Sequence, residues 1–364
     1  MNLKRFGVPI AFAVTAALAL SSCASNEGGA AAADESASSL SGSLVGAGAS
    51  SQETAQAAWI AGFQTANPDV TIDYDPSGSG AGRDTFLAGA SDFAGSDRAF
   101  KDEEIEAGGF EKCVPDSSIV ELPVYISPIA VIFNLDGVDS LDLDAATVAG
   151  IFAGTITKWN DPAIAATNPG VTLPDLAITA VHRSDKSGTT GNFTEYLAAA
   201  APDAWTAGAV EEWPFESGEA AQGTSGVVDA VKNGTGTIGY ADASRAEGLG
   251  TVAIKVGDEF VSYSPEAASA IVDASPFVSG RAEGDLAIEL DRTSTEAGVY
   301  PIVLVSYLIA CAEYADAANV ELVKEYLGFV ASAEGQDAAS ENSGSAPISD
   351  TLREKITAVI DSIQ

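Results

Sequence analysis

Hydrophobic and polar positions divide most of the chain into short strands and helices. Val70 to Tyr74 alternates apolar and polar residues, which predicts a half-buried strand. Gln52 to Ala66 carries its apolar residues at helical spacing, and Asn67-Pro68 ends that predicted helix. Val124 to Phe133 is a mostly apolar run rich in strand-forming residues, which predicts a strand, and Pro128, which interrupts it, predicts a bend. Regular structure is expected to begin near Leu44.

Further strands alternate with helices along the rest of the chain. Strands are predicted at Ile178 to Val181, Thr237 to Tyr240 and Tyr300 to Ile309, and a helical C-terminus from about Ala318. This alternation predicts an α/β fold. No internal repeat is visible in the sequence.

The N-terminus has the layout of a secretory signal, predicted over residues 1–22. Lys4 and Arg5 precede the apolar run from Val8 to Leu20, which is too short for a comfortable membrane span. Small residues before Cys23 resemble the lipobox of bacterial lipoproteins, so Cys23 is expected to be acylated and to become the mature N-terminus. The alternative is ordinary cleavage nearby, with Cys23 lost.

The residues that follow are too small and polar to bury much apolar surface. Residues 23–43 are therefore predicted to be the lipidated cysteine and a flexible tether. No later stretch is apolar for long enough to span a bilayer. The body is thus expected outside the cell, tethered to the outer face of the membrane.

The chain is strongly acidic, with 52 Asp and Glu against 17 Lys and Arg and a net charge of −35. Removal of residues 1–22 leaves about 342 residues, enough for two domains, and a charge of about −37. Such a surface repels nucleic acid and anionic lipid, so neither is an expected partner. The acidity itself is interpreted as a contribution to solubility.

Cysteine and histidine are scarce. With Cys23 acylated, Cys113 and Cys311 remain in an oxidising compartment and predict a disulfide, with two buried thiols as the alternative. The chain has one histidine and no cysteine pair at ligand spacing, so no metal and no cofactor are expected.

Three segments share one design, in which a strand leads through small residues into a helix. They are Gly46-Ala-Gly-Ala-Ser-Ser51, Ser77-Gly-Ser-Gly-Ala-Gly82 and Arg183-Ser-Asp-Lys-Ser-Gly-Thr-Thr190. The first turn of a helix leaves N–H groups without partners and carries partial positive charge. Glycine lets the backbone approach an anion, and hydroxyls add donors, so each segment is a candidate oxyanion site.

The alternative for each segment is a simple helix cap. Ser50 and Glu53 have the spacing of a capping box, and a Ser or Thr before a helix usually caps that helix. None of the three segments is a P-loop or a dinucleotide-binding glycine motif.

Taken with other blocks, these segments resemble a known family from about Leu44 to the C-terminus. The blocks are GAGAS at 46–50, SGSGAG at 77–82, DFAGSD at 92–97, IFAGTITKWNDPAI at 151–164, RSDKSGT at 183–189 and GTIGYA at 236–241. The chain resembles the phosphate-binding lipoprotein of bacterial phosphate ABC importers, a type II periplasmic-binding-protein fold. That resemblance implies an α/β fold of two lobes with a hinge and a ligand cleft between them.

The resemblance also implies a set of phosphate contacts from both lobes. They are Ser50, the backbone of Ser51, Ser79, Asp97, Arg183, Ser187, Gly188 and Thr189, with Asp185 orienting the guanidinium. Ser51 stands where an aromatic residue is common, although a backbone contact would survive that difference. His182 stands where another basic residue can occur, and we interpret it as a strand side chain.

Each lobe of such a fold is discontinuous. Residues 44–125 with 300–364 are predicted to form lobe I, and residues 126–299 lobe II, with crossings near Leu122–Ser127 and Tyr300–Ile302. Cys113 and Cys311 would then belong to one lobe, which leaves closure of the lobes free.

The function implied by the resemblance is capture without catalysis. A monomer outside the cell would close its lobes around inorganic phosphate and dock on the permease of an ABC importer. Asp97, a pure acceptor, would be satisfied by a protonated phosphate oxygen but not by sulfate. The alternatives are another oxyanion such as sulfate, molybdate or tungstate, a secreted phosphate-ester hydrolase, and an adhesin or sensor with the same fold.

Overall fold

The computed structural model describes residues 40–364. The predicted signal peptide, Cys23 and the tether up to residue 39 lie outside the described residues. The strands are β1 (Gly42–Gly48), β2 (Val70–Asp75), β3 (Phe93–Ser96), β4 (Ile119–Asn134), β5 (Ser140–Leu143), β6 (Thr179–Arg183), β7 (Glu219–Ala221), β8 (Thr237–Asp242), β9 (Gly250–Val256), β10 (Glu259–Val261) and β11 (Val303–Cys311).

Helices alternate with these strands, so the predicted α/β fold is confirmed. They are α1 (Glu53–Ala66), α2 (Ser79–Leu87), α3 (Asp102–Ala107), α4 (Ala145–Phe152), α5 (Pro162–Thr167), α6 (Gly188–Ala200), α7 (Gly223–Asn233), α8 (Pro265–Asp273), α9 (Val320–Ala331), α10 (Ala333–Ser343) and α11 (Asp350–Ser362). Short 3₁₀ helices are η1 (Ser50–Gln52), η2 (Ala243–Arg245) and η3 (Ala317–Asn319). Within residues 40–364, no helix combines the length and apolar character that crossing a bilayer demands.

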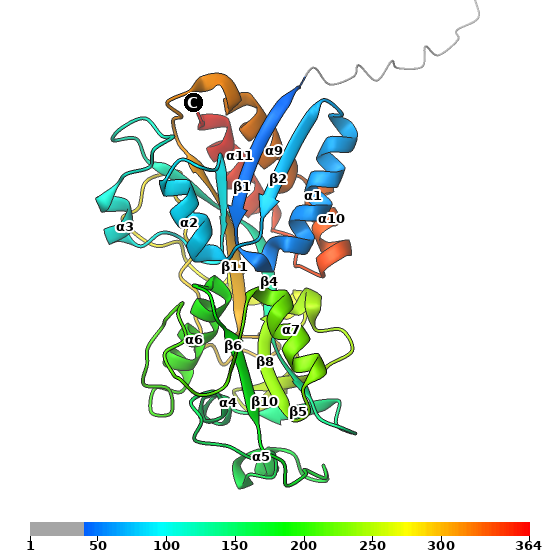
Figure 1. Cartoon of the computed structure of the whole chain (residues 1–364). Helices are drawn as coiled ribbons and strands as arrows, with labels where there is room; N and C mark the ends of the chain where they lie inside the picture. Colours follow the sequence, from blue (N-terminus) through cyan, green and yellow to red (C-terminus); the bar gives the residue numbers. More distant parts are fainter. Residues whose placement is uncertain (1–39) are drawn as a thin grey trace, which may run out of the picture. The chain divides into compact units, whose positions relative to one another are not determined.

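The strands form one sheet whose two ends build two lobes. The order is β2-β1-β3-β11-β4-β8-β6-β7, with β9 branching from β4 and carrying β5 and β10. We define lobe I by β1, β2 and β3 with α1, α2 and the C-terminal helices α9–α11, and lobe II by β5–β10 with α4–α7 (Figure 1). β1, β2 and β3 pair in parallel, as strand–helix–strand units require.

Strand β4 runs from one lobe to the other. Its residues up to Pro128 pair with β11, and from Ile129 onward it pairs with β8. Proline has no N–H to donate to a neighbouring strand, so it is tolerated at the point where β4 changes its partner. A bridge between Glu121 of β4 and Asp285 adds one further contact to the first half of β4. The exact lobe boundaries predicted from the sequence stay a prediction.

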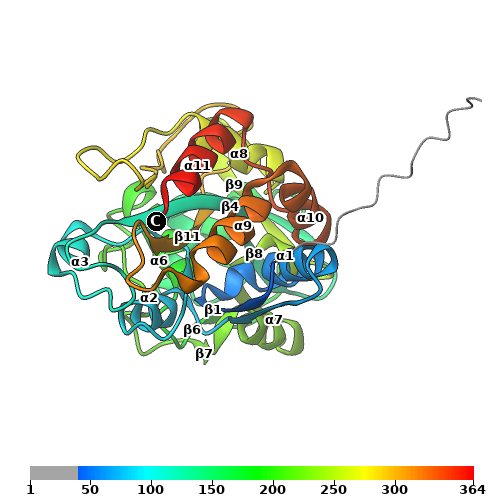
Figure 2. The same cartoon turned by 90° about the horizontal axis from the view of Figure 1, so that it is seen from above.

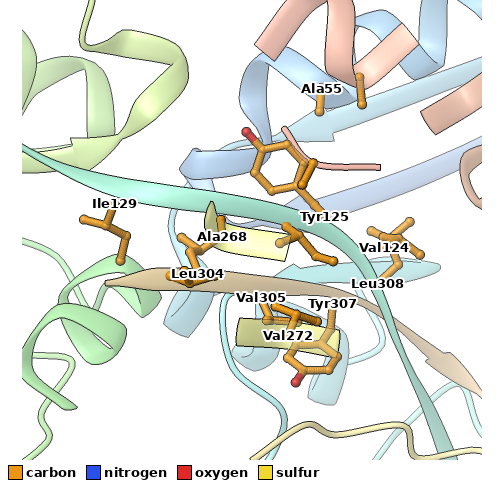
Figure 3. Close-up of a cluster of buried hydrophobic side chains, with 14 of the residues drawn as sticks. Ala55, Val124, Tyr125, Ile129, Ala268, Val272, Leu304, Val305, Tyr307 and Leu308 are labelled. Atoms are coloured by element: carbon orange, nitrogen blue, oxygen red, sulfur yellow. The ribbon is translucent and has the colours of Figure 1, made fainter. Parts of the chain in front are cut away.

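The core is thickest where β4 and β11 run side by side. Figure 3 shows Val124 and Tyr125 of β4 packed with Leu304 and Leu308 of β11, all at most 1% exposed. This apolar run was predicted to be a strand from Val124, and the observed strand begins five residues earlier.

Helices α1, α9 and α10 cover lobe I together (Figure 2). Trp59 of α1 is completely buried, and its indole N–H donates to the carbonyl oxygen of Gly335 at 2.7 Å. The predicted end of α1 at Asn67 is confirmed, since the N–H of Asn67 closes the last turn on Phe63. β1 begins at Gly42, two residues before the expected start of order.

The predicted disulfide is confirmed. Cys113 and Cys311 are bonded, with their Cα atoms 5.2 Å apart. The bond joins the end of β11 to the segment before β4, and that part of the sheet borders β3 of lobe I. Because no part of it bridges to lobe II, it leaves relative movement of the lobes unconstrained.

Candidate anion-binding site

Each of the three candidate segments joins a strand to a helix, as the sequence predicted. β1 leads into η1 and α1, β2 leads into α2, and β6 leads into α6. The first two helices start in lobe I and the third in lobe II. Their first turns supply N–H groups that have no partner inside the helix, together with the positive ends of the helix dipoles.

Asp97 lies where these segments meet, and its carboxylate is surrounded by hydroxyl donors. Ser51 and Ser306 donate to Oδ1 at 2.6 Å and 2.7 Å, and Thr189 donates to Oδ2 at 3.0 Å. The backbone N–H of Asp97 donates to the hydroxyl of Ser79 at 3.1 Å. All five residues are at most 2% exposed, so both lobes contribute to one buried polar cluster.

Burial and hydrogen bonding act on Asp97 in opposite directions. Burial raises the pKa of Asp97, while the hydroxyls of Ser51, Ser306 and Thr189 and the charge of Arg183 oppose that rise. The pKa stays raised from its ordinary value. A carboxylate has about four acceptor positions, and three are filled here, so Oδ2 keeps one for a further donor.

Arg183 is the cation of the site, and Asp185 holds its guanidinium. The Nε of Arg183 donates to Asp185 Oδ1 at 2.7 Å, and a terminal nitrogen donates to Oδ2. Burial alone would raise the pKa of Asp185, but the hydrogen bonds and charge of Arg183 lower it overall. Two of the five guanidinium donors are used in this way, which leaves three for a ligand.

Two glycines let the lobes come into contact at this point. A Cβ at Gly188 would lie 2.4 Å from the hydroxyl oxygen of Ser79 and 2.6 Å from Cβ of Asp97. A Cβ at Gly78, whose φ is +103°, would lie 2.5 Å from Oδ2 of Asp185. Both separations are shorter than real Cβ contacts, so these positions require glycine.

The structure decides between the anion site and the cap for individual residues. Ser50 and Ser79 make no side-chain cap bond at η1, α1 or α2, so the capping alternative fails for both. Ser187 does cap α6, because its hydroxyl accepts the N–H of Thr190 at 3.2 Å. The predicted contacts of Ser187 with an anion therefore involve a hydroxyl already engaged as an acceptor, with its proton free to donate.

Several polar residues of this cluster were missed by sequence reasoning. Thr224 bonds to Ser50, and Ser306 to Asp97. Asn192 donates to the carbonyl oxygen of Asp97 at 2.6 Å. Signals existed for two of them: Thr224 follows a strand in the run Gln222-Gly-Thr-Ser225, and Ser306 is a lone hydroxyl in an apolar strand.

Ion pairs join the lobes beside the cluster. Glu211, between α6 and β7, accepts from Arg83 of α2 at 2.6 Å and 2.8 Å. It also lies 3.0 Å from the guanidinium of Arg98. Arg83 is 1% exposed and donates to Ser96, the residue before Asp97, at 2.6 Å. The ion pairs therefore hold the lobes together next to the anion site.

The side chains do not assemble a hydrolase. His182 stacks on Trp213 at 4.7 Å between ring centroids, and its Nδ1 contacts the carbonyl oxygen of Arg183. The Ser187 hydroxyl bonds to the N–H of Thr190 and not to His182, so the two residues form no nucleophile–base pair. Within residues 40–364 there is no group of three His, Cys, Asp or Glu able to hold a metal ion.

Two α/β lobes with polar helix starts converging between them define the class of the molecule as a solute-binding protein of the periplasmic-binding type. The model of the PBP superfamily domain matches residues 30–334. Over 376 residues the chain is 36% identical to phosphate-binding protein PstS 3 of Mycobacterium tuberculosis, and over 380 residues it is 33% identical to PstS 2 of that organism. Both alignments cover 100% of each chain. The chain therefore belongs to the family of PstS phosphate-binding proteins.

Solved structures share the fold. A high-affinity periplasmic phosphate-binding protein bound with phosphate aligns with a TM-score of 0.69 at 22% identity, covering 87% of this chain and 93% of that one. A phosphate-binding protein from Stenotrophomonas maltophilia aligns with a TM-score of 0.64 at 20% identity, covering 87% and 93%. The resemblance to the family noted from the sequence blocks is confirmed.

Proposed function

We propose that the protein captures inorganic phosphate between its lobes and delivers it to the permease of an ABC importer, without a catalytic step. The observation that carries this proposal is the buried cluster around Asp97, to which Ser51 and Ser79 of lobe I and Thr189 of lobe II contribute. Membership of the PstS family supports the choice of phosphate among oxyanions.

The proposed phosphate contacts are those expected from the sequence. They are the hydroxyls of Ser50, Ser79, Ser187 and Thr189, the backbone N–H groups of Ser51 and Gly188, the carboxyl of Asp97 and the guanidinium of Arg183. Asp185 orients the guanidinium, and its bidentate bonds to Arg183 support that role.

A net charge near −37 does not prevent this binding. Exposed charges are screened over about 8 Å at physiological ionic strength. Donors in contact with the ligand act at about 2.7–3.0 Å, in a site from which closure removes water. Micromolar affinity corresponds to about −8 kcal/mol, and each hydrogen bond to a charged group contributes roughly 1.5–3 kcal/mol. Guanidinium and helix-start donors are numerous enough to supply that energy.

Asp97 gives the site its preference for phosphate over sulfate in this proposal. Its free acceptor position on Oδ2 is satisfied by a phosphate oxygen that carries a proton. Sulfate carries no proton near neutral pH, so Asp97 would face an unprotonated oxygen.

The proposed setting is the outer face of the cell membrane. Family membership supports a place outside the cytoplasm. The lipobox-like run before Cys23 supports acylation of that cysteine, and the protein is proposed to act as a monomer. Metabolic labelling with a fatty acid, lost in Cys23→Ser, tests the anchor; sedimentation with and without phosphate tests the monomer.

The direct test of the proposed function is calorimetric titration of the mature protein with phosphate, sulfate, molybdate and tungstate. We expect one site per chain, micromolar or tighter for phosphate, and weaker binding of the other anions. Tighter binding of another oxyanion would replace phosphate as the ligand. Turnover of a chromogenic phosphate ester would show a hydrolase instead.

A further inference from the structure

The first turn of α7 contacts both Asp185 of lobe II, which holds the proposed cation Arg183, and the proposed ligand residue Ser50 of lobe I. The N–H of Gly223 donates to Oδ1 of Asp185 at 3.1 Å. The N–H of Thr224 donates to Oγ of Ser50 at 3.3 Å, and the two hydroxyl oxygens lie 3.0 Å apart. Ser225 donates to Glu53 of α1 at 3.2 Å. Figure 1 shows α7 of lobe II below α1 of lobe I.

The Thr224–Ser50 pair is buried, with exposures of 3% and 6%. Each hydroxyl has one proton and two lone pairs. One of the two protons forms the bond between the hydroxyls, and the other is left over. The N–H of Thr224 already fills one lone pair of Ser50. When the Thr224 hydroxyl fills the other, the proton left over is that of Ser50, and it is available to an anion.

The same turn is connected to Arg183 through Asp185. Gly223 has a φ of +67°, which places its N–H toward Asp185, and glycine adopts this conformation without strain. Asp185 in turn holds the guanidinium of Arg183 by two hydrogen bonds. Adjacent residues of α7 therefore fix one proposed phosphate donor from each lobe.

We propose that Thr224 is a positioning residue for phosphate: it holds the Ser50 hydroxyl across the cleft, keeps a proton directed at the anion, and stabilises the closed lobes. This inference rests on the proposed function. The contact between Thr224 and Ser50 joins the two lobes, so Thr224 acts after the anion has entered and the lobes have closed. Loss of the Thr224 hydroxyl therefore affects release of phosphate more than capture.

The experiment compares Thr224→Val with Thr224→Ser by stopped-flow binding and release of inorganic phosphate. We expect Thr224→Val to release phosphate about tenfold faster, which corresponds to about 1.4 kcal/mol, with an unchanged association rate. Thr224→Ser keeps the hydroxyl and should restore the wild-type release rate. Thr147→Val, at a buried threonine in the first turn of α4, is the matched control and should change neither rate.

The unfolding temperature without phosphate separates positioning from structural damage. We expect Thr224→Val and Thr147→Val to unfold within a few degrees of each other, and Thr224→Ala replaces Thr224→Val if the latter does not fold. Release at the wild-type rate from Thr224→Val, or faster release from Thr224→Ser as well, would overturn the role of Thr224. Absence of phosphate binding by the wild-type protein would overturn the proposed function itself.

Discussion

The hydroxyl of Thr189 donates to Oδ2 of Asp97 at 3.0 Å, although the two residues belong to different lobes and lie 92 positions apart. Thr189 lies in the first turn of α6, and Asp97 directly follows β3, so this bond holds the start of α6 against the end of β3. Gly188 makes that distance possible, since any side chain there would collide with Ser79 and Asp97. The closed arrangement of the lobes is thus built into the residues proposed to hold phosphate.

Replacing Asp97 by Asn should weaken discrimination between anions more than affinity for phosphate. An amide can donate to an unprotonated oxygen, so sulfate no longer meets an unpaired acceptor. We expect the ratio of phosphate to sulfate affinity to fall about tenfold or more, in line with the 1–3 kcal/mol cost of an unsatisfied buried polar group. Calorimetry measures both constants.

Asp73→Asn, at an exposed position of β2, is the control and should leave the ratio unchanged. An unchanged ratio in Asp97→Asn would remove Asp97 from the selectivity.

Replacing Glu211 by Gln should loosen the closed state. The carboxylate accepts from Arg83 and Arg98 of the opposite lobe, and the side chain of Arg83 is 1% exposed while that of Glu211 is 11% exposed. Loss of one partner of a buried ion pair leaves an uncompensated charge and is costly. We expect phosphate to dissociate at least tenfold faster with little change in association, measured by stopped flow.

Glu212→Gln alters the exposed neighbouring carboxylate and should behave like the wild type. Equal dissociation rates for Glu211→Gln and Glu212→Gln would show that the ion pairs do not hold the lobes closed.

Removing the disulfide should lower stability without changing the ligand. Cys113 and Cys311 are 198 residues apart, and their bond restricts the unfolded chain. The double replacement by Ser should reduce the free energy of unfolding by about 2–5 kcal/mol, measured by thermal or urea unfolding. Phosphate affinity should stay the same, because the bond lies away from the residues proposed to bind it. A large loss of affinity in a folded variant would contradict this separation.

The contribution of Asp242 to stability should decrease with rising pH. Burial raises the pKa of Asp242 to about 6 from the usual 3.8, against hydrogen bonds from Ser244 and Tyr125. The folded state therefore binds the proton more tightly than the unfolded state between these values. This contribution to stability is complete below about pH 4 and is lost as the pH rises through about 6.

Asp242→Asn removes that dependence. Relative to the wild type, the variant should gain up to about 3 kcal/mol between pH 4 and pH 7, as two pKa units imply. Urea unfolding at both pH values measures the gain, with the exposed Asp258→Asn as control. A constant difference between wild type and Asp242→Asn across this range would contradict the raised pKa.

Local sequence pattern was sufficient to find the three strand–turn–helix segments. Glycines and hydroxyls between an apolar strand and an amphipathic helix specify a turn with free N–H groups, whatever the rest of the fold does. The run Gln222-Gly-Thr-Ser225 before α7 has the same glycine and hydroxyls, but the strand before it, Glu219–Ala221, is not apolar, so this fourth turn was missed.

Contacts between distant segments could not be predicted in this way. Ser50 meets Thr224 across 174 positions, and Arg83 meets Glu211 across 128. Which helix starts face one another depends on the strand order and on the passage of β4 between the lobes. That the three segments meet at one site was predicted from the resemblance to a family, and not from the residue patterns. Even so, it assigned Ser51 a backbone role, whereas the Ser51 hydroxyl also bonds to Asp97.

The most direct measurement is a crystal structure of the mature protein grown with phosphate. We expect one tetrahedral anion between the lobes, within hydrogen-bond distance of Arg183, Asp97 and the Ser50 hydroxyl. An anion bound at another surface, with these three residues free of it, would contradict capture between the lobes.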